Sequence, residues 1–485
     1  MRFRPALAAG LATVAALLSC NPARAWNEHA LTTWVTLQPL AAQAAEATHA
    51  THATQAAQAA LTERVRAESL ERFVAAEATQ LERLLGAHEA WARAHLDPYD
   101  ALPDALVFRA AAAGQGGGSD QPLATASDLR QRFLKALRVN AASRLPLYLQ
   151  VRPGESSGER PALPWTEVTA ITAGSGGGAR HFTFASLTEG SEVPALEVLA
   201  TAAQEPDFGL DIGLYTDSGT AQGREAGLGK QPFGNPALVY GTQAPFHMGL
   251  YHEARIVFAA APFLRRTQPE ARIALFTALA RHALATGHRY WGWRFAGWAL
   301  HYLQDLTQPY HASILPGLSA LRMIGINTVA MIGWTGPKAA ATTLVSNRHA
   351  VVESYQQQRL ALAWRAARET READPLLAAL RDTAGDAARG GYAAADVRGR
   401  ISGEAFEAAA ALDAQLERSF PTRFTADPQV ELGSETDELD MVTIARTHSA
   451  AEHERLQQQL AALLRQLGVH TRAFVRTLAE PGGTP

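Results

Sequence analysis

The sequence predicts an all-α protein, and two observations support that prediction. Alanine dominates long stretches and β-branched runs are few, which favours helix because alanine has the highest helix propensity. The clearest helix covers residues 448–478, where one face carries Leu456, Leu460, Leu463, Leu464 and Leu467. That spacing is typical of an amphipathic helix with one buried face. The 485 residues, 47% of them hydrophobic, can bury a large core in one elaborated domain or in two or three.

The other elements follow from composition and from the positions of breaks. Helices are expected over 29–97, 130–150, 185–204, 250–305 and 350–480. Gly-rich breaks at 114–119 and 174–178 are typical of surface loops or insertions. Residues 205–246 are rich in Gly and Pro, and we expect irregular structure there.

The first 25 residues have the pattern of a secretory signal peptide. Arg2 and Arg4 precede an apolar run over 5–18 that is too short to span a membrane, and Ala23-Arg24-Ala25 is a small-residue cleavage site. Cleavage there predicts a secreted or periplasmic protein whose mature chain begins at Trp26.

A lipoprotein is the alternative reading of the same segment. Leu17-Leu18-Ser19-Cys20 resembles a lipoprotein box, so the chain could instead be anchored through Cys20. We favour cleavage after Ala25, which frees the amino group of Trp26 and leaves a mature chain without cysteine. Such a chain has no disulfide and no thiolate ligand, so a metal must be held by His, carboxylate or the N-terminus.

The charge balance argues against a nucleic-acid partner. The formal net charge is −3, and the first 25 residues hold three Arg and no acid, so the mature chain carries 41 basic and 47 acidic side chains. Binding to a phosphate backbone depends on Lys and Arg. A small phosphoester bound through metal is still compatible with this charge.

The segment from His301 to His311 predicts a metal site. His301 and Asp305 are four residues apart on an expected helix, so both side chains project from one face. Pro309 ends that helix, and His311 can fold back from the following turn. Two imidazoles and a carboxylate can hold zinc, with the second carboxylate oxygen left for a neighbouring metal.

A second His and acid pair, His349 and Glu353, has the same spacing. Taken alone, this pair is more typical of an ion pair on a solvated helix face, and His301 is compatible with a hydrogen-bonded core histidine. The two segments together favour a metal centre.

At these residues the sequence resembles the zinc-dependent phospholipases C. That family carries His-x3-Asp-x5-His with Pro before the last His, and a final His-x3-Glu pair, as in His301–His311 and His349/Glu353. Its free N-terminal Trp and a nearby His bind zinc, and Trp26-Asn-Glu-His29 matches them. The resemblance implies a phospholipase C/nuclease-like multi-helix bundle with inserted loops and extra helices.

The resemblance also implies an Asp after Pro and one more His. Asp207 in Glu205-Pro206-Asp207 fits the first, and His247 is favoured over His252 for the second. The implied centre holds two to three Zn²⁺. The first zinc would take Asp207, His247, His301 and Asp305, the second His311, His349 and Glu353, and the third Trp26, His29 and Asp305. Asp207 is also the implied catalytic residue that orients or deprotonates the water.

The chain departs from the family outside the ligands. We expect a helical domain over 26–360 with insertions near 98–204 and 314–346, and a C-terminal helical extension over 361–485. The apolar insertion 314–346 has two charges, Arg322 and Lys338. It predicts either a flap in transient contact with a membrane surface or a buried hairpin or dimer surface.

The lead hypothesis is an exported zinc-dependent phosphodiesterase, a phospholipase C acting on phospholipids without an obligate protein partner. A single-strand nuclease or nucleotidase of the same superfamily is the first alternative. Those nucleases resemble one another in a Gly-Gly-Asn stretch and a final His-x3-Asp, whereas here the stretch is absent and position 353 is Glu. The second alternative is a non-enzymatic helical lipoprotein, anchored through Cys20, whose His and acid pairs are ion pairs.

Overall fold

The computed structural model describes residues 26–42, 52–110, 125–172, 178–234, 240–370 and 373–480. The predicted signal peptide with Cys20, the Gly-rich break at 114–119, and the break at 174–178 except for Gly178 lie outside the described residues.

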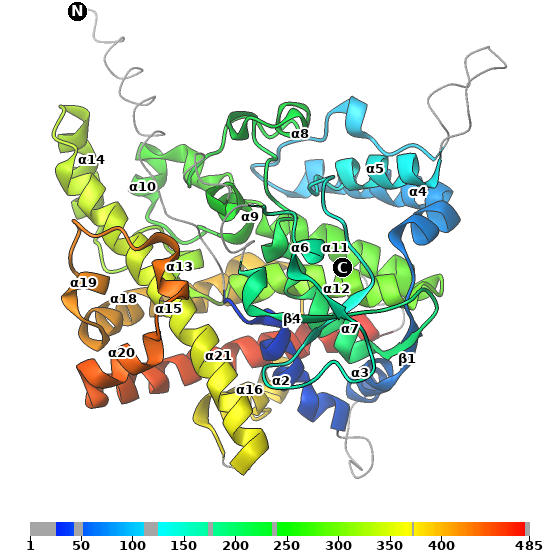
Figure 1. The fold of residues 1–485 in the computed structure, drawn as a ribbon. Helices are drawn as coiled ribbons and strands as arrows, with labels where there is room; N and C mark the ends of the chain where they lie inside the picture. Colours follow the sequence, from blue (N-terminus) through cyan, green and yellow to red (C-terminus); the bar gives the residue numbers. More distant parts are fainter. Residues whose placement is uncertain are drawn as a thin grey trace, which may run out of the picture. The chain divides into compact units, whose positions relative to one another are not determined.

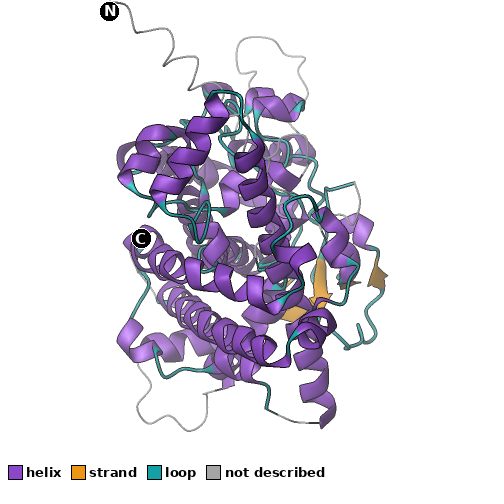
Figure 2. Ribbon diagram, turned by 90° about the vertical axis from the view of Figure 1, so that its left-hand side faces the viewer, coloured by secondary structure: helices purple, strands orange, loops and turns teal. Residues whose placement is uncertain are grey.

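The prediction of an all-α protein is confirmed. Helices account for 66% of the structure and strands for only 4%, and Figure 2 shows a few short strands among many helices. The finer expectation of a phospholipase C-like bundle stays a prediction. Among the described helices, none combines the length and apolar character needed to cross a membrane.

The chain divides into two compact units. Unit 1 is drawn from Met1–Pro39, Gln231–Glu270 and Tyr302–Phe474, and unit 2 from Leu40–Lys230, Ala271–His301 and Val475–Pro485. Both units therefore combine segments that are far apart in the sequence. One long helix, Gly336–Thr370, runs through the predicted boundary at residue 360. Unit 1 contains helices from both sides of that boundary.

Unit 1 combines helices of a single turn with much longer ones (Figure 1). Most residues of the following helices belong to it: α2(His29–Ala42), α9(Ala244–His247), α10(Arg255–Ala260), α13(Pro309–Ala312), α14(Ala320–Met331), α15(Gly336–Thr370), α16(Pro375–Arg381), α17(Asp386–Arg389), α18(Ser402–Ser419), α19(Thr422–Thr425), α20(Met441–His448) and α21(Ala450–Ala479).

The core of unit 1 forms between α15 and its neighbours. Its apolar cluster includes Val351, Val352 and Tyr355 of α15 together with side chains of α2, α16, α18 and α21. The predicted leucine stripe of 448–478 is confirmed, since all five leucines are at most 3% exposed. Periodicity identified this face correctly because a long amphipathic helix repeats the same local signal over many turns.

Unit 2 combines helices with two small sheets. Most residues of the following helices belong to it: α3(His52–Thr62), α4(Leu70–His95), α5(Ala126–Ala136), α6(Trp165–Val168), α7(Ala195–Ala202), α8(Ala221–Glu225), α11(Pro269–Ala285) and α12(Arg289–Asp305). Its strands are β1(Arg64–Arg66), β2(Tyr148–Val151), β3(Ala162–Leu163), β4(Thr183–Ser186) and β5(Glu192–Pro194).

The strands correct three expectations of helix. β1 interrupts 29–97 and pairs antiparallel with β5, where Val65 lies opposite Val193. β5 occupies part of 185–204, and β2, at the end of 130–150, pairs with the central strand β4 of the order β2-β4-β3. These short strands depend on partners distant in the chain, so composition within one window could not reveal them.

Candidate metal centre

Asp305, the last residue of α12, is the hub of a buried group in unit 1. Its Oδ1 lies 3.1 Å from His29 Nε2, at the start of α2, and its Oδ2 lies 2.8 Å from His247 Nδ1, at the end of α9. All three side chains are fully buried. The carboxylate thus presents one oxygen to each imidazole, which is the arrangement expected of a bridging ligand.

His311, His349 and Glu353 form a second buried group in unit 1. Their ligand atoms all lie within 4.8 Å of one another, so the group could hold a metal ion. Glu353 Oε1 lies 3.6 Å from His311 Nε2 and 2.6 Å from His349 Nε2. His311 also connects this group to the first, because its Nδ1 lies 3.9 Å from Asp305 Oδ2.

The turn between the two groups follows from the sequence. α12 ends at Asp305, and Pro309 opens the short helix α13, where its missing N–H costs no hydrogen bond. The amide of Gly249 donates to the carbonyl of His311 and secures the turn. Tyr310 stacks on the ring of His349, with ring centroids 5.3 Å apart. The expectation that His311 folds back toward Asp305 is therefore confirmed.

Asp207 and His301 lie together in unit 2. His301 is on α12, one helical turn before Asp305, and Asp207 is in a short 3-10 segment, η4(Glu205–Phe208). His301 Nε2 is 3.7 Å from Asp207 Oδ1, and Gln204 Nε2 donates to Asp207 Oδ2 over 2.7 Å. Both residues are buried, with exposures of 0% and 4%.

A buried ion pair secures the segment that carries Asp207. The guanidinium group of Arg294 of α12 binds the carboxylate of Glu205, with Nη2 2.7 Å from Oε1. Trp298 Nε1 donates to Oε2 of the same carboxylate over 2.6 Å. Burial by itself lowers the pKa of Arg294, but the carboxylate of Glu205 raises it above its usual range. The pair thus holds η4 against the helix that supplies His301.

The hydrogen bonds of three histidines determine which ring nitrogen carries a proton. Nδ1 contacts an acceptor in each case: the carbonyl of Ala203 for His301, the carbonyl of His247 for His311, and the amide oxygen of Gln304 for His29, at 2.8–2.9 Å. A carbonyl oxygen only accepts, so each Nδ1 must donate. The neutral tautomer then directs an Nε2 lone pair toward a carboxylate oxygen, and two facing acceptors require a cation between them.

A metal ion satisfies that requirement better than protons do. In unit 1, His29, His247, His311 and His349 share a buried site with Asp305 and Glu353. A metal ion binds the Nε2 lone pairs of neutral imidazoles and the facing carboxylate oxygens together, whereas a proton shared between them would have to charge an imidazole. Ligand atoms about 2.1 Å from a tetrahedral zinc lie roughly 3.4 Å apart, close to the separations of 3.1 Å for His29 and 3.6 Å for His311 from their carboxylates, whereas the 2.6 Å between His349 and Glu353 is a hydrogen-bonding distance.

Comparison of the chain with protein-family models, with curated proteins and with solved structures found no match.

The remaining predicted ligands have clear positions. Trp26 is fully buried in unit 1, and its indole Nε1 donates to Thr307, two residues after Asp305. The structure brings His247 to Asp305, whereas the ring of His252 contacts Ser402 and Phe406 instead. His247 is thus the better placed of the two candidates.

Sequence reasoning missed the residues that orient the ligands. Gln304 binds His29 through Oε1 and donates through Nε2 to Thr33 and Thr471, so its amide orientation is determined. Its place directly before Asp305 was an available signal. No sequence signal could identify the carbonyls of Ala203 and His247, because every residue has a carbonyl and only the fold places these two beside the imidazoles.

Replacing Gln304 tests this orienting role. Gln304→Leu removes the acceptor of His29 Nδ1, and loss of such an outer partner weakens metal affinity by about 10- to 100-fold. Gln304→Glu keeps an acceptor and should retain most of the affinity. Zinc competition against a chromophoric chelator measures both variants. Equal affinities for the parent and Gln304→Leu would contradict the role.

Proposed function

We propose that this protein is an exported zinc-dependent phosphodiesterase that acts on phospholipids as a phospholipase C. The observation that supports it most is the set of imidazoles whose Nδ1 atoms donate to protein acceptors while their Nε2 atoms face buried carboxylates. Histidines that bind metals are oriented in this way. Nitrogen and oxygen donors without any thiolate suit zinc.

Within unit 1, His311, His349 and Glu353 would hold one zinc, and His29 and Asp305 would hold another together with the freed amino group of Trp26. Asp207, His247 and His301 are proposed as further ligands on the evidence of the motif and of their own contacts.

The reaction needs an activated water and a path for protons. Bound zinc supplies Lewis acidity toward the phosphoryl oxygens and lowers the pKa of water to about 7. Asp207 is the residue that would orient the water and take its proton, since Gln204 holds its other oxygen. Attack of the water oxygen on phosphorus would then break the bond between phosphorus and the glycerol oxygen. That oxygen leaves as an alcohol after receiving a proton.

Three features support a lipid substrate over a nucleic acid. Position 353 is Glu, and the mature chain carries an excess of acidic residues. The region 314–346 also presents apolar side chains to solvent: Leu321 is 77% exposed, Ile332 80% and Trp334 66%. In α14 only Met323 and Ala330 are buried, so most side chains of this helix stay accessible. We propose that the exposed apolar side chains of this region contact the membrane surface.

Metal removal and substrate choice test the proposal. Purified protein should contain more than one zinc per chain and begin at Trp26. Chelation should abolish hydrolysis of phosphatidylcholine vesicles, and added zinc should restore it. Release of phosphocholine is the readout, with single-stranded DNA as the second substrate.

Each other outcome favours a different function. Cleavage of DNA without lipid hydrolysis would favour the nuclease. A metal-free protein acylated at Cys20 and inactive on both substrates would favour the lipoprotein scaffold.

A further inference from the structure

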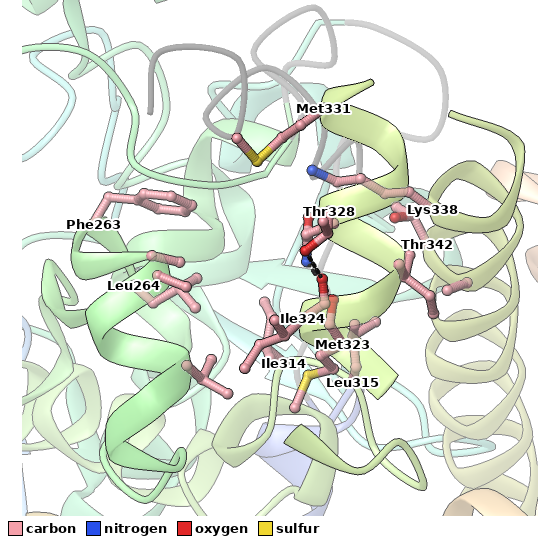
Figure 3. A pocket seen from close by; sticks show the side chains of 16 residues that line it. Phe263, Leu264, Ile314, Leu315, Met323, Ile324, Thr328, Met331, Lys338 and Thr342 are labelled. Atoms are coloured by element: carbon pink, nitrogen blue, oxygen red, sulfur yellow. Dashed lines mark hydrogen bonds between the residues drawn. The ribbon is translucent and has the colours of Figure 1, made fainter. Parts of the chain in front are cut away.

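An apolar pocket lies in unit 1 beside the region 314–346. It measures about 130 Å³ and is lined by side chains of α10, α14 and α15, of η7(Pro262–Arg265), and of the segment after α13. Phe263 and Leu264 form one wall, and Ile314 and Met323 lie near its base (Figure 3). α14 packs against both α10 and α15, so the pocket lies between elements that touch one another and is partly open to solvent.

Lys338 is the only charged side chain among the described residues that line this pocket. It is 6% exposed, and within the described chain its ammonium group forms no hydrogen bond or ion pair. Figure 3 shows its nitrogen directed from α15 across the pocket toward Met331. Burial lowers the pKa of Lys338 from its usual value, and an ammonium group that is partly withdrawn from water favours an anion beside it.

Two of the other polar groups of the lining are engaged within α14. Asn327 Nδ2 donates to the carbonyl of Met323, and Thr328 Oγ1 donates to the carbonyl of Ile324. Both bonds stay within α14, so these side chains serve their own helix. The pocket thus combines apolar walls with one cation that lacks a partner of opposite charge among the described residues.

We propose that this pocket binds a single-chain anionic amphiphile, with the chain against the apolar walls and the anionic head on Lys338. A dry cavity of about 150 Å³ takes up a benzene molecule, so 130 Å³ has room for about six carbons of a chain, and the remaining carbons of a longer chain would extend through the open side of the pocket. A medium-chain fatty acid fits this description.

The pocket is separate from the metal ligands. Lys338 precedes His349 by three turns of α15, which is about 16 Å along the helix axis. A head group on Lys338 therefore does not reach His349 or Glu353. The proposed binding is independent of the proposed hydrolytic activity and does not require metal.

Calorimetric titration of the full chain with decanoate, below its micellar concentration, tests the proposal. We expect saturable binding of one decanoate per chain. Lys338→Met should weaken it by about 10- to 100-fold, the usual worth of a hydrogen bond to a charged group. Decanol, which lacks the anion, should bind the parent and the Lys338→Met variant equally.

A matched pair of helix variants locates the chain. Ala341 lines the pocket, so Ala341→Phe should weaken both decanoate and decanol, whereas Ala339→Phe, at an exposed position of α15, should leave both unchanged. Decyl phosphate identifies the preferred anion, since tighter binding than decanoate would assign a phosphate head. Failure of the parent to bind decanoate or decyl phosphate would overturn the proposal. Equal affinities of the parent and of Lys338→Met for decanoate and for decyl phosphate would also overturn it.

Discussion

Asp305→Asn should reduce kcat/KM for phosphatidylcholine by more than about a hundredfold. Loss of a partner outside the ligand shell already costs 10- to 100-fold, and Asp305 contacts His29 and His247 directly with its two oxygens. An amide keeps the shape but loses the negative charge and one of the two acceptors. The measurement is hydrolysis of vesicles at saturating zinc.

Thermal unfolding shows whether that loss comes from metal binding or from folding. A ligand at 1,000 times its Kd stabilises the folded state by about 4 kcal/mol, so zinc should raise the Tm of the parent clearly. The Asp305→Asn variant should show a much smaller rise, although its Tm without zinc should not be lower, because a buried charge has been removed. Glu454→Gln, at an exposed position of α21, is the control and should match the parent. A fully active Asp305→Asn variant would refute the bridging role.

Glu205→Gln should destabilise unit 2 by about 3–5 kcal/mol. The variant leaves Arg294, which is 1% exposed, without its counter-charge, and removing one member of a buried pair has a cost of this size. It also deprives the indole of Trp298 of a charged acceptor. Denaturant unfolding of zinc-free protein, followed by tryptophan fluorescence, gives the change.

An exposed ion pair provides the comparison for Glu205. Glu225→Gln removes the partner of Lys135, and because both side chains are at least 39% exposed, the cost should stay below about 1 kcal/mol. Adding Arg294→Met to Glu205→Gln should recover part of the lost stability, since no buried charge then lacks a partner. If Glu205→Gln costs no more than Glu225→Gln, the pair does not secure η4.

Local signals were sufficient for much of the fold. Helix propensity and periodicity identified the all-α class and the buried leucine face of α21, because a helix satisfies its own backbone within a few residues. They failed at β1 and β5. Val65 and Val193 form a pair that exists only when residues 128 apart in the chain meet.

The candidate site likewise combines features set by local spacing with features set by long-range contacts. The sequence by itself determined the ligand pairs with helical spacing, His301 with Asp305 and His349 with Glu353, and the turn at Pro309, because four residues bring side chains to one face of any helix. Only the tertiary structure decided that His247 meets Asp305 and that backbone carbonyls orient His301 and His311. It also decided that Lys338 faces an apolar pocket. Such contacts join segments far apart in the chain, and no local pattern of residues encodes which of them meet.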